Sequence, residues 1–126
     1  MENEIKFYKC SICGNVVEVI NGDVNRVRCC GQEMQELVAN SVDAATEKQV
    51  PVVEKEGNEI IVKVGSVAHP MLEVHSILWI AQVVGNTISR VNLKPGEDAI
   101  AKFPYVKGAT VYAYCNLHGL WKTIVD

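Results

Sequence analysis

After Pro51 the chain alternates hydrophobic and polar positions with a period of two residues, which predicts β-strands rather than helices. Turn residues such as Gly57-Asn58 and Gly85-Asn86 separate the hydrophobic runs every ~8–12 residues. The predicted strands cover residues 52–56, 59–64, 77–84, 87–93, 99–105, 110–114 and 120–125. Regular turns and the lack of a long helical period predict an immunoglobulin-like β-sandwich for residues 51–126.

Residues 1–37 show short apolar runs between turn residues, with strand-like alternation over 15–20. A segment of this size buries too little apolar surface to fold by its core alone, so a bound metal is the natural means of stabilising it. Residues 38–50 are expected to connect this segment to the sandwich. A helical turn is expected over 43–48, and any helix should end before Pro51.

Composition is that of a globular protein, with 48% hydrophobic and 21% charged residues among 126. No apolar run approaches the ~20 residues that span a bilayer, and residues 1–9 do not resemble a signal peptide. We therefore expect a cytoplasmic protein without membrane segments. The formal net charge of −3 argues against non-specific binding to nucleic acid, which needs a basic surface.

All five cysteines and all three histidines fall into two clusters. The first joins Cys10 and Cys13 to the adjacent pair Cys29 and Cys30. In a reducing compartment this spacing indicates metal ligands rather than disulfides. Four thiolates suit zinc or iron about equally, so a structural zinc ribbon is one interpretation. Adjacent residues of an extended strand point to opposite faces, so Cys29 and Cys30 predict a strained tetrahedral site.

The second cluster contains His69, His75, Cys115 and His118. Cys115 and His118 are predicted to lie between two strands, and the other histidines in a loop at the sandwich edge. Taken singly, each of these residues suits an ordinary core or surface position. Together they suit either a tetrahedral structural zinc or a redox metal with an open coordination position.

The motifs around both clusters resemble those of the desulfoferrodoxin family, the two-iron class of superoxide reductases. The resemblance spans essentially the whole chain. It is carried by Tyr8-Lys-Cys-x-x-Cys-Gly-Asn15, Cys29-Cys-Gly31, Val42-Asp-Ala-Ala45, Val50-Pro-Val52, Val64-Gly-x-Val-Ala-His-Pro-Met71 and Tyr114-Cys-Asn-Leu-His-Gly-Leu-Trp-Lys122. It implies a desulforedoxin-like domain over residues 1–37, a connector over 38–50 and a neelaredoxin-like, immunoglobulin-like domain over 51–126.

The resemblance also implies two non-haem irons per chain. One is held by the four cysteines, where zinc is the alternative metal. The other has equatorial imidazoles and an axial thiolate, which places His69, His75 and His118 equatorially and Cys115 axially.

Gln49 stands where the family has a further equatorial histidine. Its amide oxygen is a weaker donor than imidazole. Three outcomes follow: a weak bond from Gln49, a water in its place, or a four-coordinate iron. A further alternative is that Gln49 faces solvent.

The activity implied by the resemblance is the one-electron reduction of superoxide to hydrogen peroxide, in defence against oxidative stress. Lys48 is expected to attract superoxide and to hold a proton-donating water, and Glu47 to coordinate ferric iron after turnover. An electron donor such as rubredoxin and a homodimer are expected as partners. The main alternative is an electron-transfer protein with iron or zinc and no enzymatic activity. A metal-stapled interaction module has less support.

Overall fold

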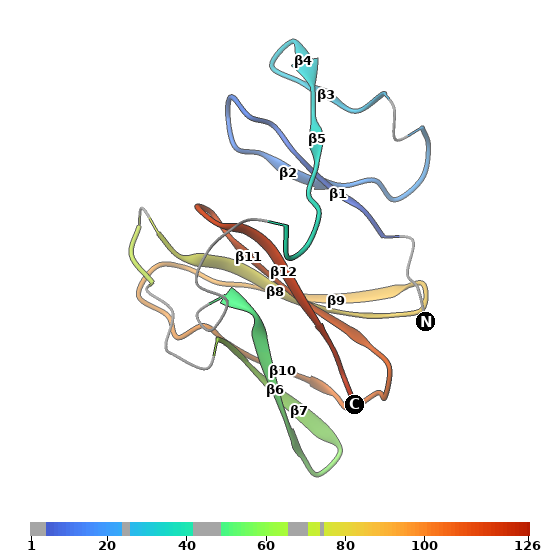
Figure 1. The fold of residues 1–126 in the computed structure, drawn as a ribbon, viewed down its shortest axis with the longest axis vertical. Coiled ribbons are helices and arrows are strands. Elements are labelled where there is room, and N and C mark those ends of the chain that lie inside the picture. Colours follow the sequence, from blue (N-terminus) through green and yellow to red (C-terminus); the bar gives the residue numbers. More distant parts are fainter. Residues whose placement is uncertain (1–4, 24–25, 42–48, 66–70, 74) are drawn as a thin grey trace. The chain divides into compact units, whose positions relative to one another are not determined.

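The computed structural model describes residues 5–23, 26–41, 49–65, 71–73 and 75–126. The described residues divide into two compact units, one within Glu4–Val38 and the other within Ala39–Asp126 (Figure 1). No helix among the described residues is long and apolar enough to cross a membrane. The helical turn predicted over 43–48 lies outside the described residues.

The first unit contains short antiparallel strands joined by turns. One sheet has the order β2-β1-β5, and β3 pairs with β4 in a separate hairpin. Its small core is formed by Tyr8, Cys10 and Met34, so one of the cysteines is itself part of the buried interior. The strands are β1 (Phe7–Lys9), β2 (Val16–Glu18), β3 (Arg28–Cys29), β4 (Gln32–Glu33) and β5 (Gln35–Glu36).

The second unit is a β-sandwich, as predicted. One antiparallel sheet has the order β10-β7-β6 and the other β12-β11-β8-β9 (Figure 1). Side chains from both sheets form the core, including the fully buried Ile60, Val62, Ile80 and Val111. The strands agree with the predicted ranges to within one residue at each end: β6 (Pro51–Glu56), β7 (Glu59–Val64), β8 (Ile77–Val84), β9 (Thr87–Asn92), β10 (Ile100–Pro104), β11 (Thr110–Cys115) and β12 (Gly119–Ile124).

A β-bulge interrupts β8 near its beginning. Tyr114 of β11 pairs with Trp79, but the next residue, Cys115, pairs with Ile77, so Leu78 has no opposite residue in β11. The extra residue turns Ile77 into the same core that Ile80 occupies three positions later. Strict alternation would have placed these two side chains on opposite faces. The bulge therefore brings the beginning of β8 to the buried side of the sheet, beside Cys115.

Candidate metal centres

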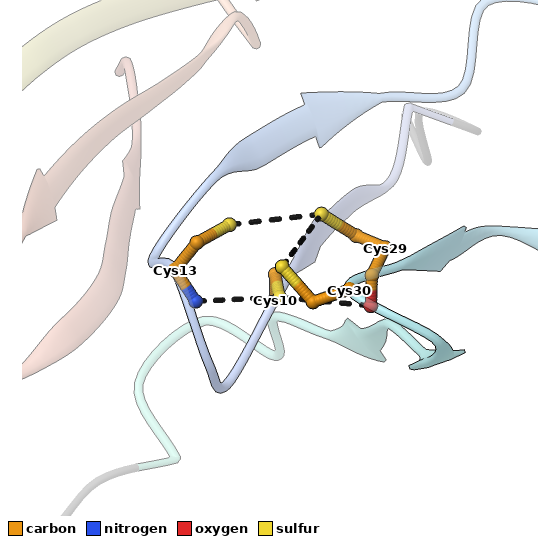
Figure 2. Close-up of side chains that lie close together, drawn as sticks. All are labelled: Cys10, Cys13, Cys29 and Cys30. Atoms are coloured by element: carbon orange, nitrogen blue, oxygen red, sulfur yellow. Dashed lines mark hydrogen bonds between the residues drawn. The ribbon is translucent and has the colours of Figure 1, made fainter.

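The four cysteines of the first unit converge from two turns (Figure 2). Cys10 follows β1, and its loop closes through hydrogen bonds from Cys10 N to Asn15 O (2.9 Å) and from Gly14 N to Cys10 O (3.0 Å). Gly14 has φ +79°, which only glycine adopts easily, and this permits the tight loop. The other two cysteines come from the end of β3 and the turn after it.

The spacing of the sulfur atoms fits a single metal ion. The Cys13 and Cys29 sulfurs lie 3.6 Å apart, and those of Cys29 and Cys30 lie 3.8 Å apart. All four lie within 4.8 Å of one another. Four thiolates about 2.3 Å from a tetrahedral metal are separated by roughly 3.8 Å. The donor set and its spacing therefore fit a four-thiolate centre.

The adjacent pair reaches one site because the backbone turns between its members. β3 ends at Cys29, and Cys30 adopts φ 53°, in the left-handed region that non-glycine residues rarely occupy. The expectation of two cysteines in one extended strand is therefore wrong. The backbone of Cys30 is strained at this φ, and Arg28 supports the turn by donating to Gly31 O at 2.9 Å.

The thiol pKa values within this cluster differ: that of Cys10 is lowered, whereas those of Cys29 and Cys30 are raised. The Cys13 backbone N–H donates to the Cys10 sulfur at 3.5 Å and, as the largest cause, lowers the pKa of Cys10 to about 6. Hydrogen bonding with Cys13, and then with Cys29, raises the pKa of Cys30 to about 12. Hydrogen bonding with Cys13 also raises the pKa of Cys29. One buried thiolate forms readily, whereas ionising the whole cluster requires a cation to compensate the charge.

The second cluster lies where β11, β12 and the beginning of β8 meet. Cys115 is the last residue of β11 and is fully buried, and His118 lies in the turn before β12. The Cys115 sulfur is 3.9 Å from His118 Nδ1. The His75 and His118 rings meet edge to face with centroids 4.9 Å apart. One donor atom from each of these three residues lies within 4.8 Å of the others.

His69, Lys48 and Glu47 lie outside the described residues. The structure therefore brings together three of the four residues predicted for this centre, and the fourth, His69, lies in a stretch that is not described.

Hydrogen bonds hold the two ligand-bearing segments together. Ser76 N donates to Asn116 Oδ1 at 3.0 Å, and Asn116 N donates to Ser76 O at 3.2 Å. Trp121 Nε1 donates to His118 O at 3.0 Å. The sequence did not reveal this role of Asn116, because its partner Ser76 is 40 positions away. Trp121 is 3% exposed, so it is buried and also supports the His118 turn.

Gln49 belongs to this cluster and does not face solvent. It is 2% exposed, and its Nε2 lies 3.0 Å from His118 Nδ1. Its Oε1 is buried and has no hydrogen-bond partner within the described part of the chain, a state that costs about 1–3 kcal/mol for a buried polar group. The solvent-facing alternative is therefore wrong. The backbone places Gln49 here because Gly65 N, after β7, donates to Val50 O at 2.9 Å.

The second cluster provides a thiol, two imidazoles and a buried amide oxygen. Thiolate and imidazole ligands suit iron, zinc or copper, whereas carboxylate and carbonyl sets suit magnesium or calcium. The donor set therefore fits a transition metal, and it is compatible with the iron that the resemblance implies.

Comparisons with known proteins assign the family. The desulfoferrodoxin N-terminal domain model matches residues 2–37, and the desulfoferrodoxin model matches residues 41–124. A desulfoferrodoxin from Syntrophotalea carbinolica is 50% identical over 124 residues, covering 98% of both chains. A desulfoferrodoxin homologue from Archaeoglobus fulgidus is 44% identical, covering 98% of this chain and 99% of the relative.

Solved structures agree with this assignment. The crystal structure of the superoxide reductase from Treponema pallidum is similar with a TM-score of 0.74 and 32% identity, covering 96% of this chain and 99% of that one. A superoxide reductase from Giardia intestinalis has a TM-score of 0.57 and 32% identity, covering 64% of this chain and 98% of that one. The two cysteine-containing clusters fit the two iron centres of desulfoferrodoxins. The chain therefore belongs to the desulfoferrodoxin family of superoxide reductases.

Proposed function

We propose that this chain reduces superoxide to hydrogen peroxide, consuming one electron and two protons and forming no dioxygen. The reaction takes place at the second centre, with iron held by His69, His75, His118 and Cys115. The single observation that carries the proposal is the convergence of His75, Cys115 and His118 within 4.8 Å at one end of the sandwich. The first centre holds a second iron through Cys10, Cys13, Cys29 and Cys30.

The proposed ligands differ in burial, and this difference suits them to different roles. Iron, when bound, supplies the electron. Cys115 is fully buried, so its sulfur is shielded from water and from dissolved oxidants, and it would donate charge to a bound iron. His75 and His118 are only partly buried, which leaves this side of the cluster accessible to a small anion. The bonds between Ser76 and Asn116 hold the segments that carry these ligands.

Two residues outside the described part of the chain complete the proposal. Lys48 attracts superoxide by its charge and holds the water that donates a proton. Glu47 would supply a carboxylate ligand to the oxidised iron. Electrons come from a donor such as rubredoxin, and the first centre either relays them or stabilises a homodimer in the cytoplasm.

Metal analysis combined with visible absorption tests the proposal. We expect two irons per chain and a thiolate-to-ferric band in the red after oxidation with hexachloroiridate, with superoxide consumed and no dioxygen released. Serine in place of Cys115 should abolish that band and leave the spectrum of the first centre unchanged. One iron per chain, without the band in the unsubstituted protein, would instead favour an electron-transfer protein without reductase activity.

A further inference from the structure

We infer that the side-chain oxygen of Gln49 is a metal ligand of the second centre, and this inference rests on the proposed function. The residue is almost fully buried, yet its Oε1 has no hydrogen-bond partner among the residues that the structure describes. An amide confined in the interior normally satisfies its oxygen. An unsatisfied acceptor on an amide that contacts His118, a member of the His75–Cys115–His118 cluster, is explained if its partner is a cation.

The position of the amide supports this assignment. Its Nε2 lies 3.0 Å from His118 Nδ1, the ring nitrogen nearest the Cys115 sulfur. Two donors about 2.1 Å from the same metal lie roughly 3.0 Å apart when they are cis to each other. The Nε2 end of the amide therefore already lies at the distance from His118 Nδ1 that is expected for a second ligand of the same metal.

The metal-free hydrogen bond explains why nitrogen rather than oxygen occupies that place. An amide nitrogen only donates, so it pairs with the lone pair of His118 Nδ1. A metal bound at Nδ1 uses the same lone pair and removes the acceptor. A half-turn of the amide then presents Oε1 in almost the same volume, because the two ends of a glutamine amide have nearly equal size.

A competing interpretation makes the opposite prediction. If Gln49 only hydrogen-bonds to His118 Nδ1, it competes with the metal, and its removal should strengthen metal binding. If Oε1 is a ligand, its removal should weaken binding. The sign of the change in metal affinity therefore separates the two interpretations without measuring turnover.

The experiment is a Co(II) titration of the full-length chain, followed by visible and near-ultraviolet absorption. Bands that Cys115→Ser removes define the second centre. We expect Gln49→Ala to lower Co(II) affinity there by about tenfold and to weaken the bands as the coordination number changes. Gln49→Glu, which keeps an oxygen donor, should retain or raise the affinity.

The Co(II) bands of the first centre and the circular dichroism spectrum report whether each variant is folded. If Gln49→Ala is misfolded, Gln49→Leu decides, because it fills a similar volume without an oxygen donor: weaker Co(II) binding supports the inference, and equal or tighter binding overturns it. Equal or tighter binding in a folded Gln49→Ala variant overturns the inference and leaves the proposed function intact. The absence of Cys115-dependent bands in the unsubstituted chain overturns the proposed function itself.

Discussion

Asn116 and Ser76 exchange two hydrogen bonds across the end of the sandwich, one through the Asn116 side chain and one through its backbone. Asn116 follows Cys115, and Ser76 follows His75. The pair therefore joins the segment that carries His75 to the turn that carries Cys115 and His118. Because Ser76 is fully buried, its backbone N–H has no water as an alternative partner.

Replacing Asn116 with alanine should loosen the second centre and leave the first unchanged. The substitution leaves a buried N–H unsatisfied, which costs about 1–3 kcal/mol, and metal affinity should fall about tenfold or more, as for other residues that orient ligands. Asn116→Asp keeps the acceptor oxygen and is the matched control. Metal titrations monitored by absorption measure both variants, and unchanged affinity in the alanine variant would rule out the positioning role.

Asn40 should contribute to the stability of the sandwich through both its backbone and its side chain. It adopts φ 61° and pairs with Lys122, accepting from its N–H at 3.0 Å and donating to its carbonyl at 3.4 Å. Alanine loses both bonds and is strained at this φ, so we expect a loss of about 1–2 kcal/mol in unfolding free energy.

The matched variant Asn40→Gly loses the same bonds but tolerates the backbone conformation. It should be less destabilised than the alanine variant. Urea unfolding followed by tryptophan fluorescence measures the difference, and equal losses would show that backbone strain contributes nothing.

Ionisation of the first centre should begin at Cys10. In the metal-free protein the thiolate absorbance should rise in a first step near pH 6, the lowered pKa of Cys10, and end in a step near pH 12, the raised pKa of Cys30. Cys10→Ser should remove the first step. If this substitution leaves the step in place, the step near pH 6 belongs to another group and not to Cys10.

The effect of these pKa changes on stability follows from their direction. The pKa of Cys10 lies below its ordinary value of 9.0, so its contribution is fully present above pH 9 and is lost as the pH falls through about 6. Cys30 behaves oppositely: its contribution is present below pH 9 and is lost as the pH rises through about 12.

Replacing Lys48 with alanine should slow the reaction with superoxide and flatten its dependence on ionic strength, because a steering charge acts through a field that salt screens. Pulse radiolysis at several salt concentrations measures both effects. Lys48→Arg keeps the charge and is the control. Identical rates for the alanine variant and the unsubstituted protein at every salt concentration would exclude steering by Lys48.

The strands could be predicted from the sequence because each turn that separates two strands is formed by residues adjacent to them in the chain. Gly57 and Gly85 both adopt positive φ, as the turns between paired strands require. The two metal-binding clusters could be recognised because they contain every cysteine and every histidine of the chain. Gln49 was harder to interpret, because its burial depends on His118, 69 positions away. Sequence spacing says nothing about contacts over such distances.

Because Leu78 has no opposite residue in β11, the number of residues in β8 matters as much as which residues they are. His75 and Ile77 are two positions apart, and the bulge sets which face of the sheet that stretch presents. Removing one residue there would restore regular pairing and exchange inner for outer side chains on the approach to Cys115. Substitutions could leave every ligand in place, whereas a single deletion would turn each side chain before the deletion to the opposite face of the sheet. In the evolution of this chain, length should therefore be more tightly constrained than composition at this end of β8.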